Sequence, residues 1–266
     1  MLKDITLGQF FPTNSVIHRL DPRIKIISEI IFIVAVFLCK NLLSFSVAIL
    51  FCLLLILISK IKFSVVFKAL KPVAFLILFT AIINLFLTSG DTYIFKWGAI
   101  SISHKGLLSA VTMALRITLL VLYTSLLTFT TSPILLTDGI ESLLKPFSKI
   151  GLPSHELAMM MTIALRFIPT LLEETDKIIM AQKSRGADFE SGNIMKRAKS
   201  LVPILVPLFI NSFKRADELA TAMECRCYRG GENRTRLKEL KYTKKDVFAF
   251  LIAIFVTVGI ILFGVL

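Results

Sequence analysis

Long runs of apolar residues, separated by short polar breaks, dominate the chain. A helix of about 20 residues crosses the roughly 30 Å hydrocarbon core of a bilayer, and apolar runs near that length recur along the sequence. We expect membrane spans at 24–38, 42–59, 72–88, 106–130 and 247–266. Pro22, at the end of a polar tail over 1–23, is a residue that commonly begins a helix. The pattern predicts an all-α integral membrane protein with about five transmembrane helices.

Two long segments between the fourth and fifth spans follow a different pattern. Apolar residues recur at helical spacing over 155–185 and 194–227, but charged residues interrupt both segments. A short amphipathic stretch after Ser132-Pro133 precedes them. Internal prolines predict bends in these helices, at Pro169, Pro203 and Pro207. We interpret both as long helices that lie in the membrane plane or enter it obliquely.

Composition and charge extend this picture to an orientation. The chain is 55% hydrophobic with a mean hydropathy of +0.78, and 31 basic against 18 acidic residues give it a net charge of +13. The link after the second span contains four basic residues, Lys60, Lys62, Lys68 and Lys71. Because positively charged loops of membrane proteins remain in the cytoplasm, this link is expected to be cytoplasmic. The N-terminus is then cytoplasmic and the C-terminus outside. We divide the chain into 1–130, a cytoplasmic or interfacial region over 131–245, and a last span over 246–266.

The residues that usually carry chemistry are sparse. No phosphate-binding Gly-x-x-x-x-Gly-Lys-Ser/Thr sequence occurs, so ATP energy would have to come from a partner. The histidines are dispersed, and Cys225-x-Cys227 lacks a second ligand pair, so we expect no metal site and no cofactor. No base-reading motif indicates nucleic-acid binding. Within the spans the sequence offers chiefly Asn84 and Arg116, which is too little for an intramembrane active site.

Arg116 lies deep in the predicted fourth span and allows two interpretations. An intramembrane arginine can mark a transport pathway, or it can pair with backbone carbonyls or an acidic residue as part of the structure. A pathway usually includes more polar groups than this chain supplies. We therefore favour the structural role for Arg116.

Two short sequences end the long segments in a similar way: Ser184-Arg185-Gly186 and Cys225-Arg226-Cys227. The backbone dipole attracts a cation to any helix C-terminus, which by itself explains one arginine near each end. It does not explain why small residues flank both arginines, an arrangement that would let a partner surface approach closely. Docking and simple helix capping both remain open from these residues alone.

Several longer strings add a resemblance along nearly the whole chain. They are Gly8-Gln9-Phe10, His18-Arg19-Leu20-Asp21-Pro22-Arg23-Ile24-Lys25, Thr131-Ser132-Pro133, Leu165-Arg166-Phe167-Ile168-Pro169-Thr170-Leu171, Gln182-Lys183-Ser184-Arg185-Gly186-Ala187 and Ala222-Met223-Glu224-Cys225-Arg226-Cys227-Tyr228. With these strings in this order, the chain resembles the transmembrane scaffold subunit, or T component, of energy-coupling factor (ECF) vitamin and metal transporters.

The resemblance implies partners and roles for the two matched endings. In that family, X-Arg-X signatures at the ends of long cytoplasmic coupling helices dock into grooves on two ATP-binding-cassette (ABC) ATPase subunits. The docking residues here would be Ser184, Arg185, Gly186, Cys225, Arg226 and Cys227. The family often has alanine before the arginine, whereas this chain has Ser184 and Cys225, which are also small. A separate membrane subunit, the S component, would capture a vitamin or metal ion in a bacterial cell membrane, and this chain would transmit motion to it without hydrolysing ATP itself.

The apolar halves of the two long segments are candidates for the contact with the substrate-binding subunit. They are too apolar for water and belong to the helices that would end at the ATPases. The residues of this surface are Leu157, Met160, Met161, Ala164, Ile168, Leu201, Leu205, Leu208 and Phe209. Two rival functions are a self-contained channel or carrier with a cytoplasmic regulatory helical domain, and a membrane enzyme acting on lipid through acids such as Glu173 or Glu174.

Overall fold

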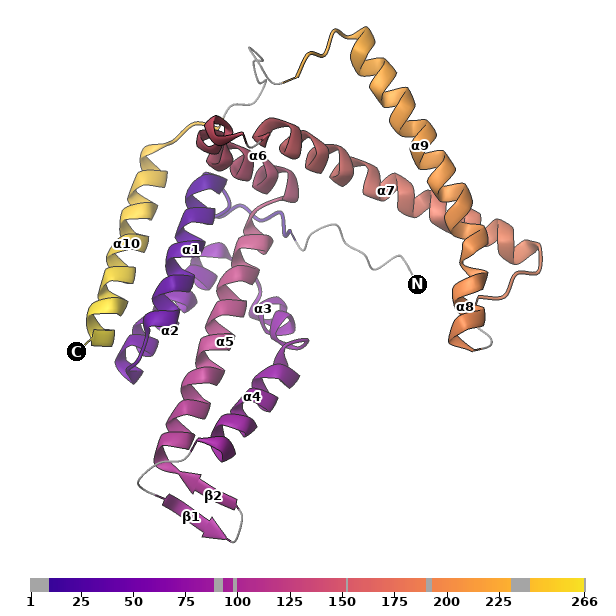
Figure 1. Ribbon diagram of the computed structural model, residues 1–266. Helices are drawn as coiled ribbons and strands as arrows, with labels where there is room; N and C mark the ends of the chain where they lie inside the picture. The colour runs from indigo at the N-terminus through magenta and orange to yellow at the C-terminus, as the bar shows by residue number, and fades with distance from the viewer. Residues whose placement is uncertain are drawn as a thin grey trace. The chain divides into compact units, whose positions relative to one another are not determined.

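The computed structural model describes residues 10–88, 93–97, 100–151, 153–189, 193–230 and 240–265, and these residues form two compact units. We call residues 10–140 with 240–265 the bundle, and residues 141–230 the α7–α9 unit. Helices dominate both units (Figure 1).

The bundle consists mainly of helices. In chain order these are α1 (Pro22–Leu38), α2 (Leu42–Ser59), α3 (Phe63–Leu70), α4 (Ala74–Leu87), α5 (His104–Thr130), the first part of α6 (Pro133–Leu144) and α10 (Lys244–Val265). Pro22 begins α1, as its sequence position predicted, and Asp21 caps the helix by accepting a hydrogen bond from the Arg23 amide. Helix α10 packs against α1 and α2, and α5 packs against α1, α2, α3 and α4.

Aromatic side chains from three helices form the centre of the bundle core. Phe32 of α1 stacks on Tyr123 of α5 with ring centroids 4.0 Å apart, and Phe51 of α2 lies 6.0 Å from Phe32. Small residues such as Ala35 and Ala48 are fully buried beside them and let the helices approach.

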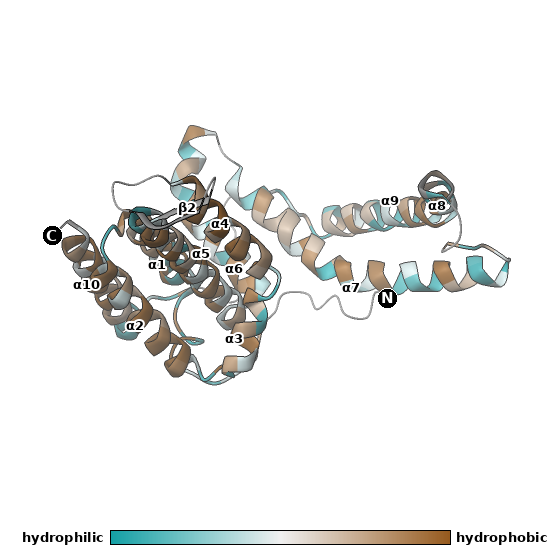
Figure 2. Ribbon diagram, turned by 90° about the horizontal axis from the view of Figure 1, so that it is seen from below, coloured by the Kyte–Doolittle hydropathy of each residue, from teal (hydrophilic) through white to brown (hydrophobic). Residues whose placement is uncertain are grey.

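Large apolar side chains also cover the outside of the bundle. Phe75 is 77% exposed and Phe255 is 80% exposed, which water would disfavour but lipid would not. Figure 2 shows hydrophobic residues over α4, α5 and α10, whereas α7 alternates between hydrophobic and hydrophilic positions. The molecule is therefore a helical membrane protein, as its sequence predicted.

The helices that could cross a membrane only partly match the predicted set. By length and composition α2, α5, α7 (Ser154–Ser184) and α10 qualify, and the bent pair α3 and α4 could add a fifth. Helix α1 has 17 residues, at the lower limit for a span. Helix α7 qualifies although its charges favoured an in-plane or oblique position, so its placement stays a prediction.

The predicted third span is shorter and bent. Helix α4 begins at Ala74, and its 14 residues reach about 21 Å, which is less than the hydrocarbon thickness. The polar link expected before it contains α3, which meets α4 at 56°. Pro72 lies in the turn between them, where its missing N–H cannot continue the helical hydrogen bonds.

A two-stranded hairpin follows α4, between the predicted third and fourth spans. Strands β1 (Tyr93–Trp97) and β2 (Ile100–Ser103) pair antiparallel, with a register shift between Tyr93 and Phe95. Ser103 then caps α5 by accepting a hydrogen bond from the Gly106 amide at 2.9 Å. A Cβ on Gly106 would lie 2.9 Å from the Leu85 carbonyl oxygen, so a glycine is needed where α5 starts against α4.

The α7–α9 unit contains the end of α6, the 3₁₀ helix η1 (Lys145–Ile150), α7, α8 (Ile194–Ser200) and α9 (Val202–Cys225). The prediction of a single helix over 194–227 was wrong, because the helix is interrupted at Leu201. Pro203 occupies the first turn of α9, where its missing N–H costs nothing, so it starts a helix rather than bending one. Pro169 and Pro207 do lie inside α7 and α9.

Candidate functional site

Helix α7 ends in a Schellman motif built from the first matched signature. The Gly186 amide donates to the Lys183 carbonyl at 3.0 Å, and the Ala187 amide donates to the Gln182 carbonyl at 3.0 Å. Arg185 is the C-cap residue, and Gly186 follows with φ +85°. A Cβ on Gly186 would meet no atom within 4 Å, so the backbone conformation, not crowding within the chain, accounts for the glycine.

Helix α9 ends in the same motif at the second signature. The Cys227 amide donates to the Glu224 carbonyl at 2.8 Å, and the Tyr228 amide donates to the Met223 carbonyl at 3.0 Å. Arg226 is the C-cap residue, and Cys227 adopts φ +57°. A non-glycine residue in this left-handed region costs roughly 1–2 kcal/mol, so the second end keeps the first end's backbone at an energetic cost.

Both arginines carry an exposed cation at the end of a helix. Arg185 and Arg226 are exposed, and neither guanidinium forms a hydrogen bond or ion pair within the described part of the chain. Their flanking residues Ser184, Gly186, Cys225 and Cys227 are exposed as well. An arginine offers five donors in a fixed fork that matches carboxylates and carbonyl oxygens. Each end can therefore bind an acidic or carbonyl-lined groove.

Polar contacts tie α7 to α9 between these ends. Glu174 of α7 accepts a hydrogen bond from Asn211 at 2.6 Å and forms an ion pair with Arg215 at 3.3 Å. Gln182, near the end of α7, donates to the Pro203 carbonyl at the start of α9. The helices are thus antiparallel, and the two signatures lie at opposite ends of the pair.

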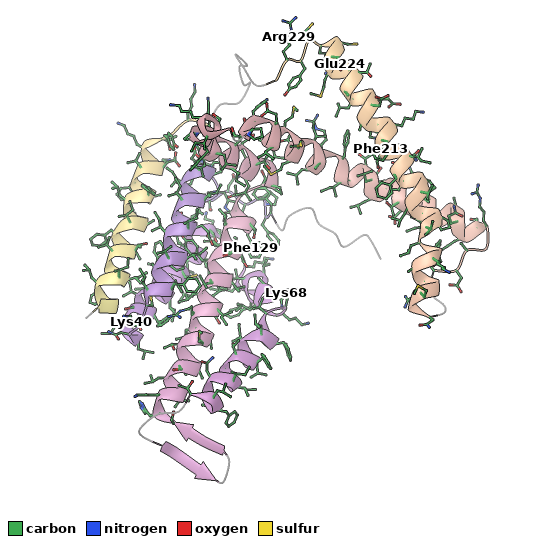
Figure 3. The ribbon with its side chains drawn as sticks, viewed as in Figure 1. Lys40, Lys68, Phe129, Phe213, Glu224 and Arg229 are labelled. Carbon is green, nitrogen blue, oxygen red and sulfur yellow. The ribbon has the colours of Figure 1, made fainter. Side chains whose placement is uncertain are left out.

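A second set of contacts extends from the end of α9 to the start of α7. The Tyr228 hydroxyl lies 3.4 Å from His155 Nε2, and His155 Nδ1 lies 3.1 Å from Glu141 Oε1. Tyr228 is also the residue whose amide closes the second Schellman motif. Figure 3 labels Glu224 on the last turn of α9 and Arg229 just beyond it, in the segment that this tyrosine contact holds.

The residues proposed for the contact with a membrane partner are apolar and partly exposed, but the antiparallel pairing places those of α7 and those of α9 toward opposite ends of the helix pair. Met160 is 54% and Phe209 60% exposed, whereas Leu157, Met161, Ile168 and Leu208 are half-buried. Ala164, Leu201 and Leu205 are exposed, as are Pro169 and Pro203. Water does not favour so many exposed apolar side chains on two adjacent helices. Lipid or a protein partner would cover these side chains.

Arg116 contacts the backbone of a neighbouring helix in the bundle. Its Nη2 donates to the Cys39 carbonyl at 2.9 Å, and its guanidinium lies 5.8 Å from the centre of the Phe37 ring. Cys39 follows α1, whose last carbonyls lack helical partners and favour a cation. This is a contact of the kind that the structural interpretation requires.

Two charged residues of α1 escaped the sequence analysis, which named chiefly Asn84 and Arg116 within the spans. Lys25 and Glu29 are 7% and 6% exposed. The Lys25 ammonium donates to the Thr130 carbonyl at 3.1 Å and to Thr131 Oγ1 at 3.0 Å, whereas Glu29 accepts from Thr124. The four-residue spacing of Lys25 and Glu29, which places both on one face of α1, was the available signal.

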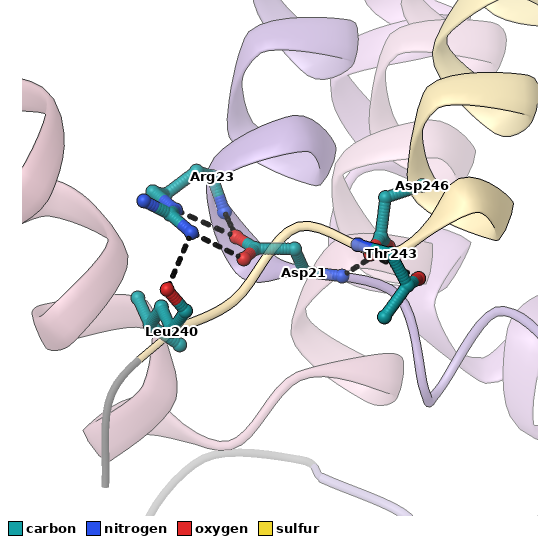
Figure 4. Close-up of polar contacts among 5 residues, drawn as sticks. All are labelled: Asp21, Arg23, Leu240, Thr243 and Asp246. Carbon is teal, nitrogen blue, oxygen red and sulfur yellow. Dashed lines mark hydrogen bonds and ion pairs between the residues drawn. The ribbon is translucent and has the colours of Figure 1, made fainter.

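A polar cluster joins the starts of α1 and α10 (Figure 4). Asp246 is 1% exposed and accepts hydrogen bonds from the Asp21 and Thr243 amides, each at 2.8 Å. Arg23 pairs with Asp21 at 2.7 Å, donates to the Leu240 carbonyl at 3.0 Å and lies over a tyrosine ring. Helix α10 begins at Lys244, slightly before the predicted start of the last span, and Asp246 lies in its first turn.

Among the described residues, no group of three His, Cys, Asp or Glu side chains could hold a metal ion. Of the two acids that a lipid enzyme would use, Glu174 is engaged with α9, whereas Glu173 is exposed on α7. The matched arginine ends therefore stand out as the candidate functional site.

Comparison with known proteins agrees with these features. A family model described as cobalt transport protein (CbiQ) matches residues 13–237. The chain is 58% identical over 255 residues to the energy-coupling factor transporter transmembrane protein EcfT of Clostridium kluyveri, covering 96% of this chain and 94% of the relative. It is 56% identical to EcfT of Acidaminococcus fermentans, over 100% and 99% of the two chains, and 46% identical to EcfT of Bacillus subtilis, over 92% and 93%.

Proposed function

Because this chain belongs to the cobalt transport protein (CbiQ) family and, within it, to the transmembrane components of energy-coupling factor transporters, we propose that it couples ATP hydrolysis by partner subunits to movement of a substrate-binding membrane subunit. The chain is a component of a transporter. Its specific partners and the coupling step are the proposal. ATP hydrolysis would take place on two ABC ATPases, identical or homologous, and not on this chain.

The observation that supports this proposal most is the repetition of one backbone motif at two helix ends. Arg185 and Arg226 both occupy the C-cap of a Schellman motif, so the guanidinium leaves each helix from the same backbone geometry. Two equal sockets on a pair of ATPases would require two such equal projections. The left-handed Cys227 fits this interpretation, because strained backbone persists where function demands it.

The apolar surface of α7 and α9 is the proposed contact for the substrate-binding subunit. It belongs to the helices whose ends would hold the ATPases, and Glu174 joins the two helices between those regions. ATP-driven movement of the arginine ends would then move the apolar surface as well. A shift in relative affinity between two states is sufficient to release a subunit.

The docking role is tested by the double variant Arg185→Glu with Arg226→Glu. Removing one member of a desolvated charged pair at an interface costs about 2–5 kcal/mol, and reversal adds repulsion. We expect the ATPases to be lost on purification of the complex through a tag on this chain, while the chain itself remains in the membrane. Substrate uptake should be lost in parallel.

A matched control carries the same charge change on the same two helices, away from their ends. Lys177 of α7 and Lys214 of α9 are exposed. The double variant Lys177→Glu with Lys214→Glu should retain the ATPases. Retention of the ATPases and of uptake in the arginine variant would contradict the proposal, whereas loss of the ATPases with uptake intact would favour a carrier that works without them.

A further inference from the structure

A basic recess lies in the bundle between the last turn of α2, the first turn of α10 and the segment before α1. Its volume is about 740 Å³. Four basic residues line it: Arg19, Lys60, Lys244 and Lys245. Because α2 and α10 are both long and apolar enough to span a membrane, the recess lies where two such helices end. That is the level of lipid headgroups.

The basic side chains of the recess have no acidic partner among the described residues. All four basic side chains are exposed, and none forms an ion pair or hydrogen bond within the described residues. Asp246 lies next to Lys245, but its carboxylate is buried and accepts from the Asp21 and Thr243 amides. Within the described ranges, the lining of the recess includes no acidic side chain. Like charges gathered in this way repel one another unless an anion joins them.

Lys60 of this recess also has an unusual backbone conformation. Lys60 follows α2 with φ +57° and ψ +25°, in the left-handed region that usually takes glycine. Keeping a lysine there is costly, and such outliers cluster at ligand-binding sites. The side chain of this residue is one of the four that line the recess.

The recess also has an apolar side. Leu57 and Ile58, in the last turn of α2, line it and are 58% and 48% exposed. A free phosphate ion would gain no favourable contact from these apolar side chains. A phospholipid would place its headgroup among the cations and its acyl chain along the apolar surface of α2.

We propose that this recess binds the phosphate headgroup of an anionic membrane phospholipid. Basic pockets between transmembrane helices are known to bind such headgroups. Each basic residue near an anionic lipid surface contributes roughly a fivefold factor to binding, so two of them contribute about 25-fold. The site lies within the bundle and its occupation is independent of the docking proposed for Arg185 and Arg226.

The test uses the full chain, purified in detergent and titrated with phosphatidylglycerol or phosphatidylcholine that carry the same acyl chains. Native mass spectrometry counts the bound lipid. We expect a preference for phosphatidylglycerol, which Lys60→Gln with Lys244→Gln weakens by about 25-fold. A second pair from the same recess, Arg19→Gln with Lys245→Gln, should weaken it similarly. Circular dichroism and the melting temperature should be unchanged, since the four side chains are exposed.

The matched control removes two charges elsewhere in the bundle. Lys68, labelled in Figure 3, and Lys71 are exposed and do not line the recess. Lys68→Gln with Lys71→Gln should leave the preference intact. An equal loss in this control would show a general charge effect and overturn the proposal, as would equal binding of phosphatidylcholine. Displacement of the lipid by millimolar inorganic phosphate would instead show a simple anion site, without the apolar contribution.

Discussion

At the residue scale, the third position of each X-Arg-X signature decides how the helix ends. Gly186 and Cys227 occupy the same position of the same motif, but only the glycine adopts a positive φ without steric cost. The small flanking residues that suggested close approach by a partner thus have a backbone explanation at Gly186. No such explanation covers Cys227, where glycine would be the easier residue.

Exchanging the two residue types should shift the stability of the two ends in opposite directions. Gly186→Ala should destabilise the end of α7 by about 1 kcal/mol, and Cys227→Gly should stabilise the end of α9 by a similar amount. Hydrogen exchange at the Ala187 and Tyr228 amides, which close the two motifs, measures this directly. Equal shifts in the same direction at both ends would contradict the shared geometry.

Two lysines of the bundle, Lys25 and Lys60, differ in burial and in their hydrogen-bond acceptors. Lys25 is buried and has backbone and hydroxyl acceptors at the end of α5, whereas Lys60 is exposed without them. A buried ammonium without acceptors would be strongly unfavourable. The burial of each charge, and not its residue type, separates structural lysines from those available to a ligand.

At the element scale, α7 and α9 act as a joined pair through a few polar contacts. Glu174 accepts from both Asn211 and Arg215, and Arg215 also lies 5.8 Å from the Phe167 ring. The side chains of Glu174 and Arg215 are 20% and 31% exposed, so solvent screens the ion pair. The pair orients the helices more than it stabilises the fold.

Glu174→Ala should therefore loosen the pair without unfolding the protein. We expect a loss of about 1 kcal/mol in the α7–α9 contact, and fewer substrate molecules transported per ATP hydrolysed in the assembled transporter. Glu173→Ala is the matched control, because Glu173 is exposed on the next position of the same helix. Equal effects of the two changes would show that the contact across the helices plays no part in coupling.

The apolar N-terminal halves of α7 and α9 lead to a second prediction at this scale. Met160→Asp or Leu205→Asp should release the substrate-binding subunit, because an unpaired carboxylate in an apolar contact costs on the order of 3 kcal/mol. The ATPases should remain bound. Co-purification of both partners measures the outcome. Loss of the ATPases with retention of the substrate-binding subunit would reverse the proposed roles.

At the scale of the whole molecule, the position of α7 relative to the membrane is the main topological question. Its length and composition allow it to cross, yet basic residues lie on both sides of it, at Lys145 and Lys149 and again at Lys183 and Arg185. Crossing would place one of these groups outside. We predict that the whole region 131–245 stays on the cytoplasmic side.

Single cysteines test this topology in a variant that lacks the four native ones. Cysteines at Gly151 and Gly192, on the two sides of α7, should both resist a membrane-impermeant thiol reagent in intact cells. A cysteine at Lys40, in the link predicted to face outside, is the positive control. Labelling at only one of the two glycine positions would mean that α7 crosses the membrane.

The sequence by itself determined the features that depend on local pattern. Apolar runs located the segments of α1, α2, α5 and α10, because burial in lipid needs only length and hydropathy. The strings around Arg185 and Arg226 indicated the family, and their similarity predicted two equivalent helix ends. Local proline chemistry was ambiguous: Pro22 and Pro203 both start helices, but only Pro22 was expected to do so.

Only the tertiary structure decided the features that depend on distant partners. Asp246 meets Asp21 across 225 residues, and Lys25 meets Thr130 across 105, so no window of sequence could pair them. The bend between α3 and α4 and the basic recess at the end of α2 likewise arise from packing of separate elements. The physical reason is that hydropathy and periodicity are properties of consecutive residues, whereas the partner of a charged side chain is set by which distant segments pack together.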